Sequence, residues 1–462
     1  MDNLCILMMA AGKGTRMVSN RAKVLHAICG VPMLRLIYRA AASLEPDDIF
    51  VVIGQDAERV RGTLDGFPAQ FVLQTEQLGT GHAIMTARPQ IETRHGDLLV
   101  LSGDTPRLRP ETLRRLVEHH RQSGAAATLL TAITEDPFAY GRILRNAGGQ
   151  IVAIVEEKDA TAEQRQIKEI NAGFYCFQIR PLLDALLQIS NRNAQQEYYL
   201  TDLVAVQQRQ GLRVEPLLHG DFEELRGINN RKELAEIAKA MRAEKNEELM
   251  KTGVTLIDPE CTYVDLDVVV EKDVTLYPMV TLAGTTRIGE GATVHSGTRI
   301  VDSTIGPEVI ILESCLITDA EIGKGTTVGP CAHLKGHSVI GERCRVGNFV
   351  EIKKSKLGNG TKAAHLAYLG DATIGSNVNI GAGVITCNYD GVRKSATIIE
   401  DEVFVGTDSQ LVAPVRIGRG AYVAAGSCIT GDVPAGALGI ARSRQTIKAD
   451  WVQRRKGAKP AG

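Results

Sequence analysis

The sequence predicts two kinds of fold in one chain, an α/β sheet followed by a parallel β-helix, and three observations lead to this prediction. In the second half, aliphatic residues recur at every sixth position over long stretches. In the first half, apolar segments alternate with amphipathic ones, and one charged amphipathic stretch, 231–251, separates the halves. The predicted class is therefore α/β plus all-β: a doubly wound, Rossmann-like sheet, a linker helix, and a β-helix of hexapeptide repeats.

The six-residue period is the strongest pattern in the chain. Three unbroken series carry it: Val264, Val270, Leu276, Leu282, Ile288, Val294 and Ile300; Ile322, Val328, Leu334, Ile340, Val346 and Ile352; and Ile399, Val405, Leu411, Ile417, Val423 and Ile429. Neither a helix nor an alternating strand keeps this spacing. In a parallel β-helix each hexad supplies one short strand and one corner. A β-sandwich is the alternative, but sandwiches do not repeat in sequence.

Glycines and two interruptions mark the repeat further. Glycine follows the aliphatic residue at six sites, where we expect a corner to need its backbone freedom: Gly289, Gly306, Gly323, Gly341, Gly375 and Gly418. The period falters at 353–371 and at 387–394, and both stretches are rich in basic, aromatic or histidine residues. Interruptions of a solenoid usually form surface loops, so we expect loops on a binding face.

Composition limits the classes of protein that the chain can belong to. Its 53 Lys and Arg balance 54 Asp and Glu, which argues against a general nucleic-acid or membrane-surface binder. The nine cysteines include no C-x-x-C pair, which argues against a disulfide framework or a zinc ribbon and for a reducing compartment. The N-terminus lacks the features of a signal peptide, and no apolar run is long enough to cross a bilayer. We therefore expect a cytoplasmic protein.

Apolar segments at 4–9, 49–53, 71–73, 98–101 and 128–133 are the predicted strands of the first half. Ligands of such sheets bind at the carboxyl ends of the strands. The loop after the first strand is glycine-rich and holds Lys13 and Arg16, with Lys23 close behind. Backbone N–H groups and cations together favour phosphate binding, although a structural turn would also explain the glycines. The loop is neither a Walker A motif nor a dinucleotide fingerprint, since Met17 replaces the third glycine.

Asp104 follows directly after the fourth predicted strand, in the segment Ser-Gly-Asp-Thr-Pro. A carboxylate in this position can hold a hard cation such as Mg²⁺. A turn or helix cap is an equally good interpretation of the residue.

Motifs along the whole first half resemble the sugar-phosphate nucleotidylyltransferases. AAGKGTRM (10–17) and KVLH (23–26) carry this signature, and QTEQLGTGH (74–82) narrows the resemblance. The narrower family is that of the bifunctional bacterial N-acetylglucosamine-1-phosphate uridylyltransferases/glucosamine-1-phosphate N-acetyltransferases. The resemblance continues through 140–142, 154–160, 169–173, 197–199 and 227–231. It departs at Ala22, where the family usually has proline.

This resemblance implies roles for residues of the first half. Arg16 and Lys23 would act catalytically on the triphosphate, while a sugar phosphate attacks its α-phosphorus. UTP would be bound by Ala10, Ala11, Gly12, Gly14, Lys23, Gln74, Gly79 and Thr80. N-acetylglucosamine phosphate would be bound by Gly141, Glu156, Asn171 and Asn229, and Mg²⁺ by Asp104 and Asn229. Simpler interpretations exist for three positions: Glu156 as a solvated strand end, Gln74 as a polar loop residue, and Asn229 or Asn230 as a helix cap.

The second half resembles the acetyltransferase half of the same family at 346–354, 365–371, 377–383 and 387–391. The resemblance implies a left-handed β-helix that assembles as a homotrimer, with His365 as the base that frees the sugar amine. Glucosamine phosphate would be bound by Lys335, Lys353, Tyr368, Asn379 and Lys394, and acetyl-CoA by Ala382, Asn388, Tyr389, Thr407, Ala425 and Arg442. From spacing alone, His365 would be a packed or surface histidine. At 333–336 the family has arginines around Pro-Gly, and here Lys335 must make the phosphate contact.

We therefore predict a uridylyltransferase domain at 1–230, a linker helix at 231–251 and an acetyltransferase domain at 252–462, ending in a basic tail from Arg442. The enzyme would use acetyl-CoA, UTP and Mg²⁺, with no nucleic-acid or membrane partner. One alternative is a single-activity nucleotidylyltransferase whose solenoid serves only for assembly or regulation. Another is a non-catalytic scaffold that binds a nucleotide sugar.

Overall fold

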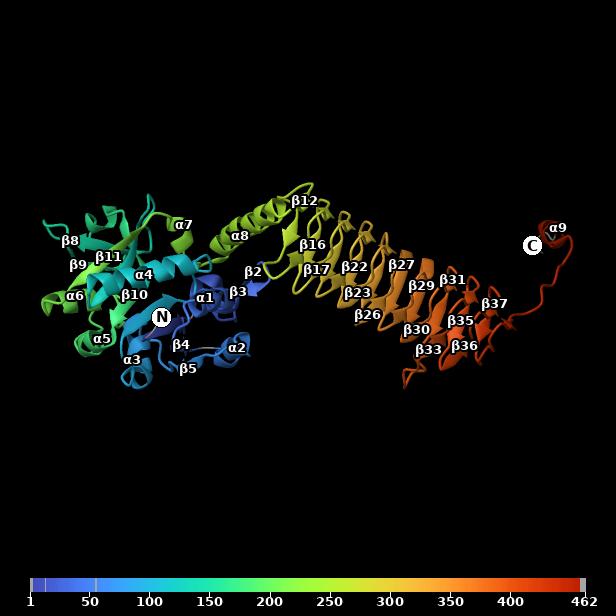
Figure 1. Cartoon of the computed structure of the whole chain (residues 1–462), viewed down its shortest axis with the longest axis horizontal. Helices are drawn as coiled ribbons and strands as arrows, with labels where there is room; N and C mark the ends of the chain where they lie inside the picture. Colours follow the sequence, from blue (N-terminus) through green and yellow to red (C-terminus); the bar gives the residue numbers. More distant parts are fainter. Residues whose placement is uncertain (1–2, 13, 55, 458–462) are drawn as a thin grey trace, which may run out of the picture. The chain divides into compact units, whose positions relative to one another are not determined.

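A computed structural model of the chain describes residues 3–12, 14–54 and 56–457 (Figure 1). The chain divides into two compact units, Met1–Met241 and Arg242–Gly462. The predicted helix at 231–251 is confirmed as α8 (Arg231–Lys251), and Gly253 follows it with a φ of 95°. The division into three functional segments stays a prediction. Among the described residues, no helix is both long and apolar enough to cross a membrane.

The first unit is built on one twisted sheet in the order β11-β7-β10-β6-β1-β4-β5, with β8 and β9 beside β10. All neighbouring strands of this order are parallel except β10, which runs antiparallel to β6 and β7. The strands are β1 (Leu4–Ala10), β4 (Asp48–Ile53), β5 (Gln70–Leu73), β6 (Asp97–Ser102), β7 (Ala127–Ile133), β8 (Gly141–Arg145), β9 (Ile151–Val155), β10 (Glu169–Gln178) and β11 (Val214–His219); a small hairpin joins β2 (Ala27–Ile28) to β3 (Val31–Pro32). The five predicted strands are all present.

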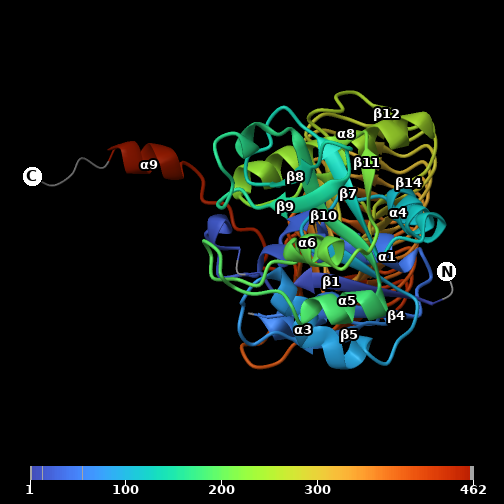
Figure 2. The ribbon, with the colours of Figure 1, turned by 90° about the vertical axis from the view of Figure 1, so that its left-hand side faces the viewer.

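Helices cover both faces of this sheet because its central strands are apolar throughout. Along β1, Leu4, Ile6 and Met8 belong to one buried cluster, with residues of α1 and α4, whereas Cys5 and Leu7 belong to another, with residues of α3, α5 and α6. Figure 2 shows the sheet between these two helical layers. The helices of the unit are α1 (Met33–Ala42), α2 (Ala57–Thr63), α3 (Thr80–Ile91), α4 (Pro110–Ser123), α5 (Ile179–Leu186), α6 (Asp202–Arg209) and α7 (Phe222–Leu225). The doubly wound prediction is confirmed.

The second unit is a parallel β-helix whose coils stack in three columns of short strands (Figure 1). The first column holds β12 (Thr255–Leu256), β15 (Thr275–Leu276), β18 (Thr293–Val294), β21 (Ile310–Ile311), β24 (Thr327–Val328), β31 (Asn379–Ile380), β34 (Phe404–Val405), β37 (Tyr422–Val423) and β39 (Leu438–Gly439). The second holds β13 (Tyr263–Val264), β16 (Thr281–Ala283), β19 (Arg299–Val301), β22 (Leu316–Thr318), β25 (His333–Lys335), β32 (Ile385–Cys387), β35 (Gln410–Val412) and β38 (Cys428–Ile429). The third holds β14 (Val269–Val270), β17 (Arg287–Ile288), β20 (Thr304–Ile305), β23 (Ala320–Ile322), β26 (Ser338–Ile340), β28 (Lys356–Leu357), β30 (Ala372–Ile374), β33 (Thr397–Ile399) and β36 (Val415–Ile417). A last helix, α9 (Trp451–Gly457), lies in the basic tail.

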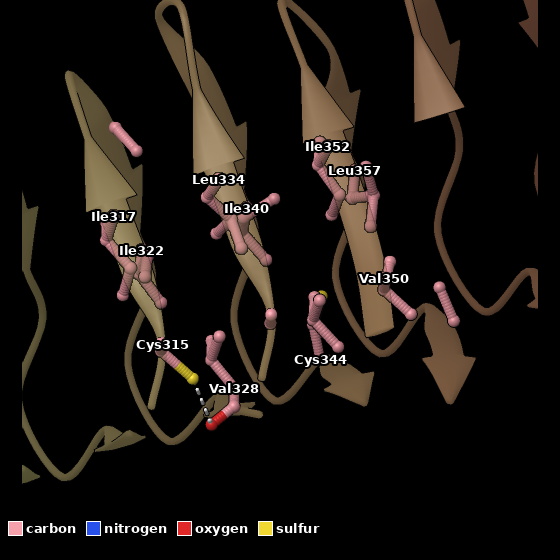
Figure 3. Packing of buried hydrophobic residues seen from close by; sticks show 14 of the residues in the cluster. Cys315, Ile317, Ile322, Val328, Leu334, Ile340, Cys344, Val350, Ile352 and Leu357 are labelled. Carbon is pink, nitrogen blue, oxygen red and sulfur yellow. Dashed lines mark hydrogen bonds between the residues drawn. The ribbon is translucent and has the colours of Figure 1, made fainter. Parts of the chain in front are cut away.

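The hexad residues form the core of the β-helix. Every member of the three aliphatic series is buried, and in-register residues of successive coils, such as Ile317 and Leu334, stack on one another (Figure 3). Adjacent coils lie at the usual inter-strand separation, so each side chain contacts its counterparts above and below. The predicted β-helix is confirmed, with the period and short strands typical of the left-handed class.

Our explanation of the six corner glycines was wrong. None of the six lies in the left-handed region of φ, and the corners at positive φ are often held by other residues, such as Asp273 and Asn377. Glycine is needed at these six sites for space: a Cβ on Gly289 would lie 2.7 Å from the backbone N of Pro307. On Gly375, a Cβ would lie 2.5 Å from the backbone N of Asp401. Close backbone approach between coils, and not an unusual φ, excludes a side chain there.

Only one of the two interruptions forms a surface loop. At the first, β27 (Arg345–Lys353) and β29 (Lys362–Gly370) are long parallel strands that run through a corner and join two columns. The prediction of a loop at 353–371 was therefore wrong. The second interruption does form one, which Asp390 closes by accepting hydrogen bonds from the backbone N–H groups of Val392 (2.7 Å) and Arg393 (2.6 Å).

The stacking of hexad residues predicts a large penalty for emptying one position. Ile317→Ala removes a side chain with 0% exposure between two full neighbours, so unfolding of the second unit should become easier by about 2–5 kcal/mol. Urea denaturation of the full chain, followed by circular dichroism, would measure this. The matched control is Leu316→Ala, which truncates the adjacent side chain with 38% exposure and should cost less than about 1 kcal/mol. Equal losses in the two variants would contradict the stacked core.

Candidate functional site

The predicted site residues of the first unit converge on one edge of the sheet. Strands β1, β4, β5 and β6 are parallel, so their carboxyl ends meet there, and the antiparallel β10 begins at the same edge. A cavity of about 840 Å³ opens at this edge. Among the residues that line it are seven that the sequence singled out: Arg16, Thr80, Asp104, Gly141, Glu156, Asn171 and Asn229.

A cluster of cations and oxygens occupies one wall of this cavity. The Lys23 ammonium donates to Asp104 Oδ2 and lies 3.4 Å from Asn229 Oδ1, which also accepts from Arg16 Nη2 at 3.0 Å. The Ser102 hydroxyl donates to Asp104 Oδ1 at 2.6 Å. Burial alone would raise the pKa of Asp104, but the Lys23 ammonium and these hydrogen bonds hold it below its ordinary value. Asp104 is therefore a carboxylate already paired with a cation.

The structure gives different roles to the two asparagines that precede α8. Asn230 caps the helix: its Oδ1 accepts from the Glu233 backbone N–H at 2.9 Å, and its Nδ2 donates to Glu233 Oε1 at 2.6 Å. The Asn229 backbone N–H, one residue before the cap, donates to Glu233 Oε2 at 2.6 Å, which gives a variant of the capping box. The Asn229 side chain thus remains available to Lys23 and Arg16. The capping interpretation holds for Asn230 and is wrong for the Asn229 side chain.

Arg231, at the start of α8, holds the glycine-rich loop in place. Its guanidinium donates to the Met17 carbonyl at 3.2 Å and lies 3.2 Å from His26 Nδ1. Burial and the nearby guanidinium groups of Arg231 and Arg21 lower the pKa of His26, so its neutral ring can accept this hydrogen bond. The loop carries Arg16 in the 3₁₀ turn Thr15–Met17 and Lys23 in the next one, Lys23–Leu25. Lys13, also singled out in the sequence, lies outside the described residues.

The lining of the cavity also contains an acid whose surroundings disfavour its charged form. Glu156 follows β9, and its Oε1 accepts from the Thr201 hydroxyl at 3.0 Å. Burial raises the pKa of Glu156, and Asp202, Asp159 and Glu197 add to this, while the Thr201 hydrogen bond offsets part of it. This carboxyl is not a simple solvated strand end. Close by, Gly141 is paired with Asn171 across two strands, and Asn171 Nδ2 donates to the Tyr175 hydroxyl at 2.7 Å.

The remaining predicted UTP residues lie around the ends of β1 and β5. Gln74 is only 3% exposed, and its side chain donates to the Gly79 carbonyl at 3.3 Å. Gly79 has a φ of 106°, and a Cβ there would lie 2.6 Å from the Tyr198 carbonyl, so only glycine fits. At Gly14 a Cβ would lie 2.7 Å from Lys23 Cβ, whereas at Gly12 it would meet open space. Ala10 and Ala11, also expected at UTP, are buried at the end of β1.

In the second unit, the strand register brings His365 into one line with three predicted acetyl-CoA residues. His365 is exposed in β29, at the corner between two columns. Continuing the register of the adjoining strands through this corner aligns Ala382, Thr407 and Ala425 with His365 on successive coils. The Arg442 guanidinium donates to the Ala425 carbonyl at 3.0 Å, at the far end of this column.

Three of the five predicted glucosamine-phosphate residues share one face. Lys335 and Lys353 are in register on adjacent coils, and Lys353 is in register with Gly370. A Cβ on Gly370 would lie 2.4 Å from the Tyr368 hydroxyl, so Tyr368 covers this glycine next to Lys353. Lys335 Nζ already has a partner, Glu351 Oε1 at 2.8 Å.

The other two glucosamine-phosphate residues lie elsewhere in the chain. Asn379 is in the neighbouring column. Lys394 is in the surface loop, where its backbone forms an antiparallel β-bridge with Tyr389. The predicted acetyl-CoA residue Asn388 anchors this loop, since its Nδ2 donates to Asp371 Oδ2 at 2.5 Å. Tyr389 beside it is exposed.

Comparisons with known proteins match both halves of the chain. Residues 6–173 match the family model described as MobA-like NTP transferase domain, and residues 260–357 match the one described as GMPPB C-terminal domain. A Pelobacter propionicus protein named Bifunctional protein GlmU is 45% identical over 99% of this chain and 99% of its own length. The chain belongs to the GlmU family. Relatives of the same name are 46% identical in a Geobacillus species, over 97% of both chains, and in Geobacter metallireducens, over 98% of both.

Membership of the GlmU family confirms the resemblance predicted from the motifs, while the role of each residue stays a prediction. Sequence reasoning missed several residues that hold the predicted ones in place: Ser102, Thr201, Tyr175, His26 and Arg231. Arg231 was part of the last motif of the resemblance, but its local position, at a helix start, gave no sign of contact with the loop at 14–26. Such contacts join residues more than 200 positions apart.

The raised pKa of Glu156 predicts that this site lowers the stability of the folded chain. Between the ordinary carboxyl value of 4.5 and its raised value, the folded chain binds more protons at Glu156 than the unfolded chain does, so stability falls as pH rises through this window. Glu156→Gln should therefore raise the unfolding midpoint at neutral pH, and the gain should vanish below the ordinary value. Thermal denaturation at several pH values measures this, with the exposed Glu118→Gln on α4 as control. A midpoint lowered at neutral pH would show that the ionised form is stabilised instead.

Proposed function

We propose that this GlmU-family chain makes UDP-N-acetylglucosamine in two separate active sites. The second unit transfers an acetyl group from acetyl-CoA to the amine of glucosamine-1-phosphate. The first unit then couples the product, N-acetylglucosamine-1-phosphate, to UTP and releases pyrophosphate, which supplies precursor for peptidoglycan and lipopolysaccharide. One observation carries the proposal. The chain matches a bifunctional relative over 99% of its length, and each of its units holds a cluster of predicted site residues. In the first unit this is the Lys23–Asp104 cluster, and in the second it is the exposed His365 with the residues aligned to it on successive coils.

In the uridylyl transfer, an oxygen of the sugar phosphate forms a bond to the α-phosphorus of UTP while the bond to the pyrophosphate oxygen breaks. Negative charge moves onto the leaving pyrophosphate. Arg16 and Lys23, both fixed by contacts to Asn229, provide positive charge where this develops. Glu156 and Asn171, which also line the cavity, would hold the sugar. The side chains contribute position and charge, and no covalent intermediate is needed.

The residues present fit a magnesium ion. Asp104 Oδ2 and Asn229 Oδ1 both lie against the Lys23 ammonium, so two oxygens already converge on one cation. Mg²⁺ is commonly held by one or two protein oxygens together with substrate phosphates. When bound, the ion would neutralise phosphate charge during the transfer.

In the acetyl transfer, His365 takes a proton from the ammonium group of the sugar, and the freed amine attacks the thioester carbonyl. The new carbon–nitrogen bond forms, the carbon–sulfur bond breaks, and the CoA sulfur leaves as a thiolate that takes up a proton. Lys335 and Lys353 on the neighbouring face provide charge for the sugar phosphate. The column that holds Ala382, Thr407 and Ala425 would accept the CoA arm. The nine cysteines all lie in the described part of the chain and none forms a disulfide there, and direct attack by the amine requires none of them.

A homotrimer in the cytoplasm is part of this proposal. Within one chain, Lys335 and Lys353 are in register with each other, whereas Asn379 is in another column and Lys394 in the surface loop, so a partner subunit could complete the sugar-phosphate site. Phe349 and Leu366, beside the His365 corner, are 60% and 62% exposed and provide apolar surface for such a contact. The balanced charge of the chain argues against nucleic-acid or membrane partners.

Two separate assays with Mg²⁺ test the proposal. One supplies glucosamine-1-phosphate and acetyl-CoA and measures free CoA thiol; the other supplies N-acetylglucosamine-1-phosphate and UTP and measures pyrophosphate. His365→Ala should lower only the first rate, by about 10²–10⁴-fold, because it removes the general base. Asp104→Ala, or chelation of the metal, should abolish only the second.

Each variant serves as the folding control of the other. Pyrophosphate release without CoA release in the unaltered chain would favour the alternative of a single-activity nucleotidylyltransferase with an assembling solenoid. Loss of both activities in either variant would contradict two independent sites.

The lysine at position 335, where the family has arginine, predicts an effect on the KM for the sugar phosphate. A lysine lacks the bidentate fork of arginine, and this one is also paired with Glu351, so its hold on the sugar phosphate should be weak. Lys335→Arg should lower the KM for glucosamine-1-phosphate by about three- to tenfold, with KM for acetyl-CoA unchanged. Lys324→Arg, which alters a lysine paired with Glu308 at 3.0 Å on another coil, is the control. An unaltered KM would show that Lys335 does not contact the phosphate.

A further inference from the structure

The orientation of the Gln74 side chain is determined by two acceptors. Its amide nitrogen lies 3.3 Å from the Gly79 carbonyl and 2.9 Å from His82 Nδ1. A backbone carbonyl can only accept a hydrogen bond, so the atom that faces Gly79 must be the nitrogen and not the oxygen of the amide. The second N–H of the same nitrogen is then directed at His82 Nδ1. The two partners together leave only one way for the Gln74 amide to lie.

This arrangement also determines which ring nitrogen of the neutral His82 carries the proton. Because Nδ1 must accept from Gln74, the proton of the neutral ring is on Nε2. The ring stacks near Tyr198, with centroids 6.3 Å apart and planes inclined by 28°. The Tyr198 backbone in turn holds the segment on both sides, donating to the Leu78 carbonyl at 2.7 Å and accepting from the Gly81 N–H at 2.8 Å. His82 is thus held firmly enough to orient its neighbour.

The consequence is a directed acceptor at the ligand edge of the sheet. With both N–H bonds of the amide engaged, Gln74 Oε1 remains, and none of the described residues forms a hydrogen bond with it. Gln74 follows β5, whose carboxyl end belongs to the edge where the cavity opens. An oxygen that can only accept recognises a ring N–H, as in N3 of uracil, and repels the N3 lone pair of cytosine. A flipped amide would present the opposite preference.

We propose that His82 is a positioning residue that sets the nucleobase preference of the nucleotidyl-transfer site by holding the Gln74 amide in one orientation. This rests on the proposed function, in which a uridine nucleotide binds beside Gln74. The ligand chemistry that His82 selects is a pyrimidine with an N–H at position 3. Without the His82 acceptor, the one hydrogen bond left to the amide among the described residues is the longer Gly79 contact of 3.3 Å.

Two substitutions of His82 separate positioning from packing. His82→Leu keeps much of the volume but removes the acceptor, whereas in His82→Asn the side-chain oxygen can take the place of Nδ1. The measurement is kcat/KM with UTP and with CTP, each with N-acetylglucosamine-1-phosphate, together with the rate of acetyl transfer. We expect His82→Leu to lower the UTP-to-CTP ratio by about ten- to a hundredfold and His82→Asn to restore most of it. Acetyl transfer should stay unchanged in both.

The ratio of the two nucleotides is the decisive result. If His82→Leu lowers both values equally, or leaves the ratio unaltered, His82 has only a structural role and the inference is wrong. Gln74→Met provides an independent arm: it removes the acceptor oxygen itself, so the preference for UTP should fall there as well, and an unaltered preference would also overturn the inference. An unaltered chain that releases no pyrophosphate with UTP would contradict the proposed function itself, before any variant is compared.

Discussion

Parallel pairing of strands is the constraint on which both candidate sites depend. In the first unit, parallel β1, β4, β5 and β6 end at one edge, so loops that are far apart in the chain meet around one cavity. In the second, parallel coils align equivalent positions, so His365 and the predicted acetyl-CoA residues Ala382, Thr407 and Ala425 follow one another at the same corner. The backbone hydrogen bonds between strands thus determine where the candidate side chains lie. The loops add the side chains that would contact substrates.

This placement buries polar groups away from water, and each of them needs hydrogen bonds or an opposite charge to offset the loss of solvation. Asp104 is stabilised as a carboxylate because a lysine and a serine contact it. Glu156 is only partly compensated by Thr201, and its raised pKa shows the remaining cost. The two carboxyl groups of the cavity therefore differ. The charge of Asp104 is balanced by Lys23, whereas the charged form of Glu156 is disfavoured by its surroundings. Such contrasts are typical of sites adapted to bind a charged ligand at the expense of stability.

A second layer of residues orients the groups that would contact substrates. Arg231 ties the glycine-rich loop to α8, and the Asn230–Glu233 capping box leaves the Asn229 side chain free for the cations. His82 acts in the same way on Gln74. In the β-helix, Gly370 makes room for Tyr368 beside Lys353. In both candidate sites, the residues predicted to contact ligands are therefore positioned by residues that need not touch a ligand themselves.

The sequence by itself determined the fold class, the family and the repeat, because periodicity and ordered motifs are local properties that one strand or loop carries alone. It predicted candidate residues for the sites, whose roles stay predictions, but not their arrangement. Only the tertiary structure showed that Asn230 caps a helix and Asn229 does not, that the corner glycines serve close coil packing, and that β27 and β29 are strands. The orientation of Gln74 was decided there too. These features depend on which atoms of distant segments approach within hydrogen-bond or van der Waals distance, and spacing along the chain does not encode that approach.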